Sequence, residues 1–170
     1  MSSFRKRAPE GRGRDAPGTG NDSEQAERAA LMLLARRDFA TQELAARLSE
    51  RGFDAPIVAQ IIAALCARRA LDDARFAGHF VAYRAARGQG PVRIERALAD
   101  LGVATVHIEA ALAEGPDWRS LAAEARRRRF GATVPLLWTE RSRQARFLQY
   151  RGFSADHIRS ALVSEDTADP

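Results

Sequence analysis

Three glycines, Gly52, Gly102 and Gly152, recur at an interval of fifty residues and divide the chain into three similar segments. In each segment a leucine precedes the glycine by four positions, and apolar residues follow it at one, six and ten positions. These apolar sets are Leu48, Phe53, Val58 and Ile62; Leu98, Val103, Ile108 and Leu112; and Leu148, Phe153, Ile158 and Leu162. Such a period is typical of repeat proteins, whose units stack and bury a continuous core. The chain is therefore predicted to be an array of one module used three times.

Each segment carries the signals of three helices. Apolar residues before each glycine are spaced as on one helix face, and a glycine directly after them ends a helix in the left-handed conformation. No alternating stretch long enough for a strand occurs. We expect an all-α fold of three tandem three-helix repeats forming an elongated, curved array. The predicted helices span about residues 23–37, 41–51, 54–69, 72–87, 91–101, 104–114, 117–130, 135–151 and 154–164.

The predicted domains follow from these helices. Residues 23–70, 71–115 and 116–164 form the three repeats, and residues 165–170 form an acidic tail. Residues 1–22 lack apolar periodicity and are rich in Gly, Pro, Arg and Ser, so we expect a disordered basic tail and no signal peptide.

Capping residues are predicted at several helix starts. Asp22 or Ser23 is expected to cap the first helix, Asp72 or Asp73 the fourth, and Asp54 and Ser154 the helices that follow their corner glycines. Ala104 takes the equivalent position in the second repeat, where its methyl group is a poor cap.

Positive charge is concentrated in the third repeat. Residues 116–151 hold nine arginines against Asp117, Glu124 and Glu140, whereas residues 24–115 hold twelve arginines and twelve acids. We expect this basic repeat to contact an acidic or phosphate-bearing partner. The candidate residues are Arg126, Arg127, Arg128, Arg129, Arg141, Arg143, Arg146 and Arg151, followed by Arg75, Arg84 and Arg93 of the middle repeat.

The simpler alternative is a solvated helix face, because the chain has a single lysine, Lys6, among many arginines and alanines. Four consecutive arginines cover most of a helix's circumference, so at least one of Arg126–Arg129 must lie near the packed side or a neighbouring surface. The aromatic residues that interleave with these arginines could stack on unpaired bases, although such residues more often belong to the core, as we expect for Phe147. Trp138 is the best candidate among them for an exposed ring.

The sequence gives no sign of catalysis, a cofactor or a metal site. Gly88-Gln89-Gly90 is not followed by the Lys-Ser/Thr of a phosphate-binding loop, so it is interpreted as a break between helices. His107 and His157 occupy the same repeat position, which favours a structural role. With Cys66 as the only cysteine, a disulfide within the chain is excluded. No apolar run approaches the ~20 residues of a membrane span, and we expect a cytoplasmic protein that is not an enzyme.

The order of short motifs resembles the RecX regulators of the RecA recombinase over residues 24–162. The matching motifs are Arg36-Arg37-Asp38, Glu43-Leu44, Leu71-Asp72-Asp73-Ala74-Arg75-Phe76, Arg84, Gly88-Gln89-Gly90-Pro91, Arg93-Ile94, Leu98 to Gly102-Val103, Asp117-Trp118, Arg129-Phe130-Gly131 and Arg146-Phe147-Leu148-Gln149-Tyr150-Arg151-Gly152-Phe153.

The resemblance implies a curved helical array without an active site that binds the RecA nucleoprotein filament and inhibits its ATPase, strand-exchange and coprotease activities. Such a protein would affect homologous recombination, DNA repair and the SOS response. Single- or double-stranded DNA phosphates are a further expected partner.

Two other functions stay open: a non-specific DNA-binding protein and a helical scaffold. Sequence-specific reading is disfavoured because the first turns after the corner glycines offer no Arg, Asn or Gln to a base edge. We expect a monomer; the alternative is a domain-swapped dimer in which two chains exchange a terminal repeat.

Overall fold

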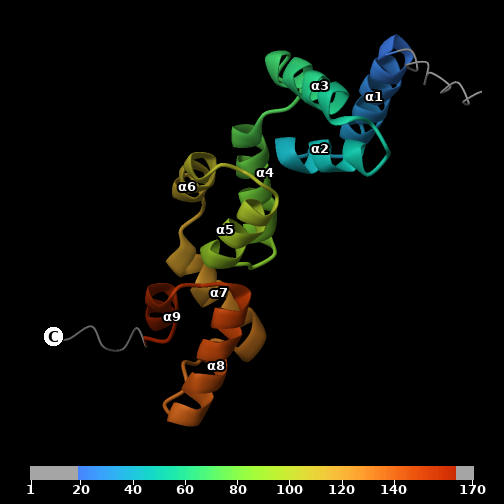
Figure 1. The fold of residues 1–170 in the computed structure, drawn as a ribbon. Coiled ribbons are helices and arrows are strands. Elements are labelled where there is room, and N and C mark those ends of the chain that lie inside the picture. Colours follow the sequence, from blue (N-terminus) through green and yellow to red (C-terminus); the bar gives the residue numbers. More distant parts are fainter. Residues whose placement is uncertain (1–18, 164–170) are drawn as a thin grey trace, which may run out of the picture.

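The computed structural model describes residues 19–163, and within this range the chain forms nine α-helices and no β-strand (Figure 1). In chain order these are α1 (Thr19–Leu34), α2 (Thr41–Ser49), α3 (Ala55–Ala67), α4 (Asp73–Ala86), α5 (Pro91–Asp100), α6 (Thr105–Ala113), α7 (Trp118–Phe130), α8 (Trp138–Arg151) and α9 (Ala155–Ala161). The helices pack in three consecutive groups, which we call repeats 1, 2 and 3: α1 with α2 and α3, α4 with α5 and α6, and α7 with α8 and α9. The groups follow one another along an elongated molecule, so the predicted all-α array of three-helix repeats is confirmed (Figure 1).

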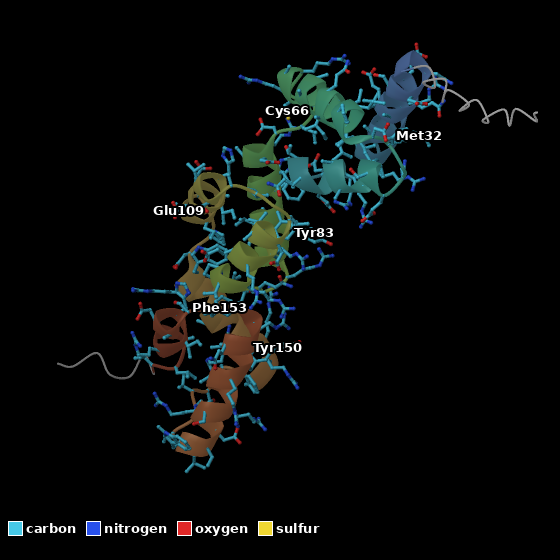
Figure 2. All side chains as sticks on the ribbon, viewed as in Figure 1. Met32, Cys66, Tyr83, Glu109, Tyr150 and Phe153 are labelled. Atoms are coloured by element: carbon cyan, nitrogen blue, oxygen red, sulfur yellow. The ribbon has the colours of Figure 1, made fainter. Side chains whose placement is uncertain are left out.

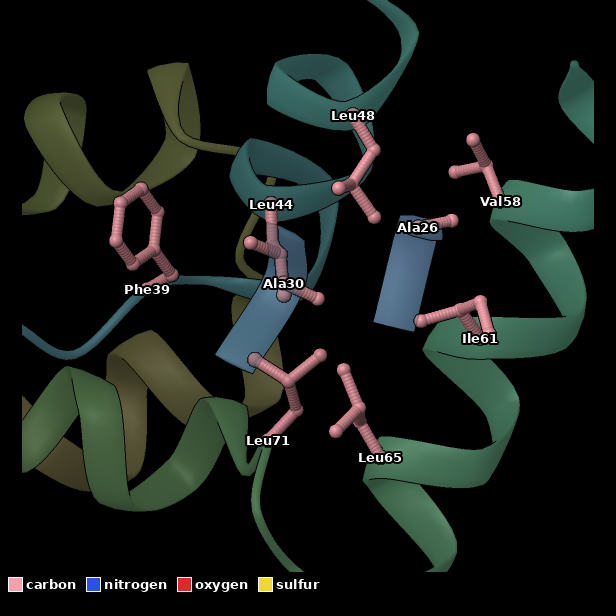
Figure 3. Close-up of a cluster of buried hydrophobic side chains, with 9 residues drawn as sticks. All are labelled: Ala26, Ala30, Phe39, Leu44, Leu48, Val58, Ile61, Leu65 and Leu71. Carbon is pink, nitrogen blue, oxygen red and sulfur yellow. The ribbon is translucent and has the colours of Figure 1, made fainter. Parts of the chain in front are cut away.

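Each repeat has its own core. In repeat 1, Leu44 and Leu48 of α2 face Ala26 and Ala30 of α1, and the third side of this cluster comes from α3 (Figure 3). The small alanines let α1 approach α2 closely, and the leucine side chains of α2 fill the space between the helices.

The core of repeat 3 is smaller and partly polar. Its buried apolar cluster consists of Ala122, Leu148, Phe153 and Ala161. Two polar residues, Arg126 and Gln144, are also buried in this repeat. Because less apolar surface is removed from water here, we expect repeat 3 to be the least stable of the three.

The three corner glycines adopt the predicted conformation. Their φ angles are +91° for Gly52, +78° for Gly102 and +89° for Gly152. This left-handed region is costly for residues that carry a Cβ, so the glycine period is explained by the backbone of each corner.

Several helix boundaries differ from the prediction. The first helix was expected at 23–37, but α1 spans Thr19–Leu34, so residues 19–22 of the predicted tail are helical. Proline at 135 does not begin the eighth helix, because the chain stays irregular until Trp138. The ninth helix ends at Ala161 rather than at 164. The tails predicted over 1–18 and 165–170 lie outside the described residues.

The predicted caps are confirmed at two helices and wrong at two. Asp22 and Ser23 do not precede the first helix, because α1 begins at Thr19 and both residues lie within it. The Asp72 carboxylate accepts a hydrogen bond from the Arg75 backbone N–H at 3.0 Å, and the Ser154 hydroxyl accepts one from His157 N–H at 3.3 Å. Asp54 stands at the start of α3 without a side-chain capping bond, because Pro56 in the first turn leaves fewer donors to satisfy. At α6, Ala104 provides no cap, as expected.

Neighbouring repeats join where the second helix of one repeat begins. At the first junction, the Thr41 N–H at the start of α2 donates to the Asp73 carboxylate of α4 at 2.8 Å. Ala40 is buried in the core of repeat 2. A Cβ on Gly102 would overlap the Gln42 side chain, so the glycine also permits close approach between the repeats.

The second junction uses the equivalent positions and is held by backbone hydrogen bonds. Gly90 N–H donates to the Arg151 carbonyl at 2.8 Å, and Val92 N–H donates to the Gly152 carbonyl at 3.0 Å. The first amides of α5 thus bind the last carbonyls of α8, which satisfies donors and acceptors that helix ends otherwise leave open. A Cβ on Gly152 would overlap Arg93.

Candidate binding surface at the junction of repeats 2 and 3

The four consecutive arginines of α7 have different surroundings. Arg126 is 5% exposed and donates to the carbonyls of Thr133 at 3.1 Å and Ala132 at 2.9 Å. Burial, and next the charge of Arg127, lowers the pKa of Arg126. The expectation that at least one of the four lies near the packed side or a neighbouring surface is therefore confirmed, and Arg126 holds the loop between α7 and α8 instead of presenting its charge to solvent.

The other three arginines are exposed and point to two different grooves. Arg128 pairs with Glu124 one turn earlier at 2.5 Å, and the Arg129 guanidinium lies 5.7 Å from the Phe130 ring centre. Both line a groove beside repeat 2. Arg127 lines a separate groove between α7, α9 and the loop that follows α7.

Two arginines predicted in the middle repeat support their own repeat. Arg75 donates to the carbonyls of Arg69 at 3.1 Å and Ala70 at 3.3 Å, which closes the turn between α3 and α4. Arg84 is half-buried, with its guanidinium 4.8 Å from the Phe80 ring centre. These contacts hold both side chains against their own repeat, although Arg75 stays exposed.

Two neighbouring hollows of the surface share Arg129 and Phe147 in their lining, and we call the two together the junction groove. It extends from the end of α4, across α7, to the outer face of α8. Its arginines are Arg87, Arg128, Arg129, Arg143, Arg146 and Arg151. Its aromatic residues are Phe130, Phe147 and Tyr150, and its acids are Glu124 and Glu140.

Arginine–aromatic pairs lie in and beside the junction groove. The Arg87 guanidinium is 3.7 Å from the ring centre of Tyr83, and the Arg93 guanidinium is 5.3 Å from that of Tyr150. Tyr83 projects from α4 and Tyr150 from α8, where its side chain is 75% exposed (Figure 2). Exposed rings combined with guanidinium groups suit the stacking of unpaired bases as well as charge contacts.

Two arginines connect the groove to the repeat junction. Arg151 donates to the Arg87 carbonyl at 3.0 Å, and Arg93 donates to the Tyr150 carbonyl at 3.2 Å. Each crosses from one repeat to the other. A partner bound in the groove would therefore contact residues that set how repeats 2 and 3 are joined.

The sequence prediction omitted Tyr83 and Arg87, which the fold adds to this surface. Tyr83 lies in the last turn of α4 and Arg87 directly follows the helix. Their spacing of four residues places the two side chains on one face, and this spacing was the available signal. Arg141, predicted with the others, is half-buried on α8 and does not line the groove. Phe147 packs against the core of repeat 3 and also lines the groove.

Trp138, the best candidate for an exposed ring, is 79% exposed, and Leu136 and Leu137 just before it are exposed as well. His157 is part of a capping box with Ser154, which supports the predicted structural role.

Among the described residues, no three His, Cys, Asp or Glu side chains gather in a way that could hold a metal ion. No helix in residues 19–163 is long and apolar enough to cross a membrane.

Models of one protein family match the chain in three consecutive pieces. The first three-helix domain of RecX matches residues 26–65, the second matches residues 72–112, and the third matches residues 118–162. These pieces coincide with the three helical groups of the fold.

Similar proteins carry the same description. The chain is 46% identical over 151 residues to a "Regulatory protein RecX" of Halorhodospira halophila, covering 88% of this chain and 94% of the relative. A Pseudomonas fluorescens protein of the same name is 38% identical over 143 residues, covering 84% and 92%. The crystal structure of RecX from Lactobacillus salivarius superposes with a TM-score of 0.72 at 21% identity, covering 84% of this chain and 96% of that one.

Proposed function

The chain belongs to the RecX family of regulatory proteins, and from this premise we propose that it binds the RecA–DNA filament in the cytoplasm and inhibits the recombinase. The observation that carries the proposal is the junction groove, where six arginines from two repeats surround aromatic side chains. A filament presents DNA phosphates and protein carboxylates along one helical surface. Guanidinium groups bind both kinds of anion through paired hydrogen bonds.

The shape of the array supports a filament rather than a small ligand. Repeat proteins bind through extended surfaces because each unit adds contacts beside those of its neighbour. Individual contacts of exposed charges are weak, about 0.2–1 kcal/mol each. Several of them on one rigid body add through effective concentration, so that no single residue dominates binding.

The proposal is tested by removing charge from the junction groove alone. A groove variant carries Arg129→Ala, Arg143→Ala and Arg146→Ala, three exposed residues outside the repeat junction. A matched control carries Arg28→Ala, Arg36→Ala and Arg51→Ala, which removes equal charge from exposed positions in repeat 1. Loss of three such contacts is expected to weaken binding by about 3- to 100-fold.

The assay is DNA-dependent ATP hydrolysis by RecA, titrated with each protein. The concentration for half-inhibition should rise for the groove variant and stay unchanged for the control. If both variants inhibit as well as the parent at low and at moderate salt, the groove is a solvated surface and the proposal fails. If both lose inhibition equally, only net charge matters.

A second candidate is non-specific binding to naked DNA, which the exposed Tyr83 and Tyr150 favour. Binding of a labelled single-stranded oligonucleotide is measured over a range of salt concentrations. Each lost phosphate contact lowers the slope of log affinity against log salt by about 0.7–0.9. Repeats 1 and 2 have no net charge, so the protein as a whole attracts naked DNA only weakly and we expect the filament to be its main partner. The groove variant should therefore lose more inhibition of the filament than affinity for naked DNA.

A further inference from the structure

The basic repeat has a second groove on the opposite side of α7 from the junction groove. It lies between α7, α9 and the loop that follows α7. Arg119 and Arg127 provide its exposed charge, and the buried Arg126 also lines it. Leu136 and Val163 provide exposed apolar surface, and Ser160 adds a hydroxyl.

The two exposed arginines of this groove form no ion pair within the part of the chain that the structure describes. Arg128, Arg143 and Arg159 each pair with an acid one turn away on their own helix. Among the described residues, neither Arg119 nor Arg127 has a carboxylate within ion-pair distance.

The chain leaves the described structure inside this groove. Val163 is one of the residues that line it, and residues 164–170 follow. They include Glu165, Asp166 and Asp169 and no basic residue. We propose that residues 164–170 occupy this groove, with their carboxylates on Arg119 and Arg127.

The spacing of the two sets of charges agrees. Arg119 and Arg127 are two turns apart on α7, which at 1.5 Å per residue is about 12 Å. An extended chain advances about 3.3 Å per residue, so Asp166 and Asp169 are about 10 Å apart and Glu165 and Asp169 about 13 Å. Starting from Val163, the segment is long enough to pass both arginines.

Weak contacts suffice because the segment is tethered at the groove. Exposed ion pairs contribute only about 0.2–1 kcal/mol each. A short tether gives an effective concentration in the millimolar range, so two such pairs and an apolar contact shift the equilibrium toward the docked segment without high intrinsic affinity.

The docked segment would neutralise one face of repeat 3 and leave the junction groove uncovered. It thereby directs polyanions to the face that repeats 2 and 3 share. The docking itself does not depend on the partner proposed above, since both sides of the contact belong to this chain.

The experiment is paramagnetic relaxation enhancement on the full chain. The only cysteine, Cys66, is replaced by serine, and a nitroxide is attached at Ala168→Cys. In low salt, the amide signals of Ser120, Ala123, Arg127 and Val134 should lose most of their intensity. They should recover in 1 M salt, where the screening length falls to about 3 Å.

Matched variants decide whether the contact is specific. Arg119→Gln with Arg127→Gln should abolish the broadening, whereas Arg28→Gln with Arg36→Gln, which removes equal charge from repeat 1, should preserve it. Broadening restricted to residues 160–163 in the parent would overturn the proposal. So would broadening on α7 that persists in the Arg119→Gln, Arg127→Gln variant.

Discussion

Replacement of Gly152 by alanine is expected to cost more than the same change at Gly52, although both glycines have nearly the same backbone conformation. Their φ angles are +89° and +91°. The left-handed conformation alone costs a residue with a Cβ about 1–2 kcal/mol. At Gly52 no atom lies within 4 Å of the added Cβ, so the cost should stop at this value.

At Gly152 the added methyl group meets the preceding repeat. It would overlap the Arg93 Cβ and lie 2.7 Å from the Arg93 backbone nitrogen, so α5 and α8 must separate. Separation breaks the hydrogen bonds from Gly90 and Val92 to the last carbonyls of α8. Two such bonds contribute about 1–3 kcal/mol, which raises the expected cost at Gly152 to about 2–5 kcal/mol.

The measurement is urea unfolding followed by far-UV circular dichroism. Gly52→Ala should lower the free energy of unfolding by about 1–2 kcal/mol and keep a single transition. Gly152→Ala should lower it further and broaden the transition, because repeat 3 loses the interface that couples it to repeat 2. Equal losses for the two variants would refute the argument that close approach at the junction stabilises the array.

Three further predictions concern repeat 3 and its caps. Arg126→Ala should destabilise the protein by at least about 3 kcal/mol in urea unfolding, since it loses two hydrogen bonds from a charged donor, which contribute about 1.5–3 kcal/mol each. Arg127→Ala should change stability by less than about 0.5 kcal/mol, and equal effects would show that Arg126 does not hold the loop. Ser154→Ala should cost about 1 kcal/mol through loss of its cap, and Asp54→Ala should leave the melting temperature nearly unchanged because that carboxylate makes no capping bond. Burial, and next the charge of Arg119, lowers the pKa of His157, so the unfolded chain binds the proton first as pH falls below the ordinary value of about 6.5. The contribution of His157 to stability is present above that pH and is lost as pH falls through the folded-state pKa; in thermal melts between pH 8 and pH 5, His157→Gln should flatten this decline, and an unchanged slope would contradict the assignment.

The sequence by itself determined the module, its three copies and the conformation of the corners. These properties are local or periodic: a helix needs apolar residues at helical spacing, and a left-handed corner favours glycine wherever the rest of the chain lies. The family resemblance rested on the same ordered motifs, and three consecutive RecX domain models match this chain. Local signals were less reliable at helix ends. The chain is irregular from Gly131 to Leu137, for example, so α8 begins at Trp138 and not at residue 135 as predicted.

Only the tertiary structure decided which arginines are buried and which surface groove each exposed arginine lines. Arg126 through Arg129 are consecutive and chemically identical, yet one is buried against carbonyls, one lines the groove beside α9, and two line the junction groove. The contacts between Arg151 and Arg87, and between Arg93 and Tyr150, join residues far apart in sequence. The direction of each side chain depends on the rotation of its helix against neighbours contributed by distant parts of the chain. For the same reason, Gly102 and Gly152 meet the preceding repeat whereas Gly52, in the first repeat, has no repeat before it to meet.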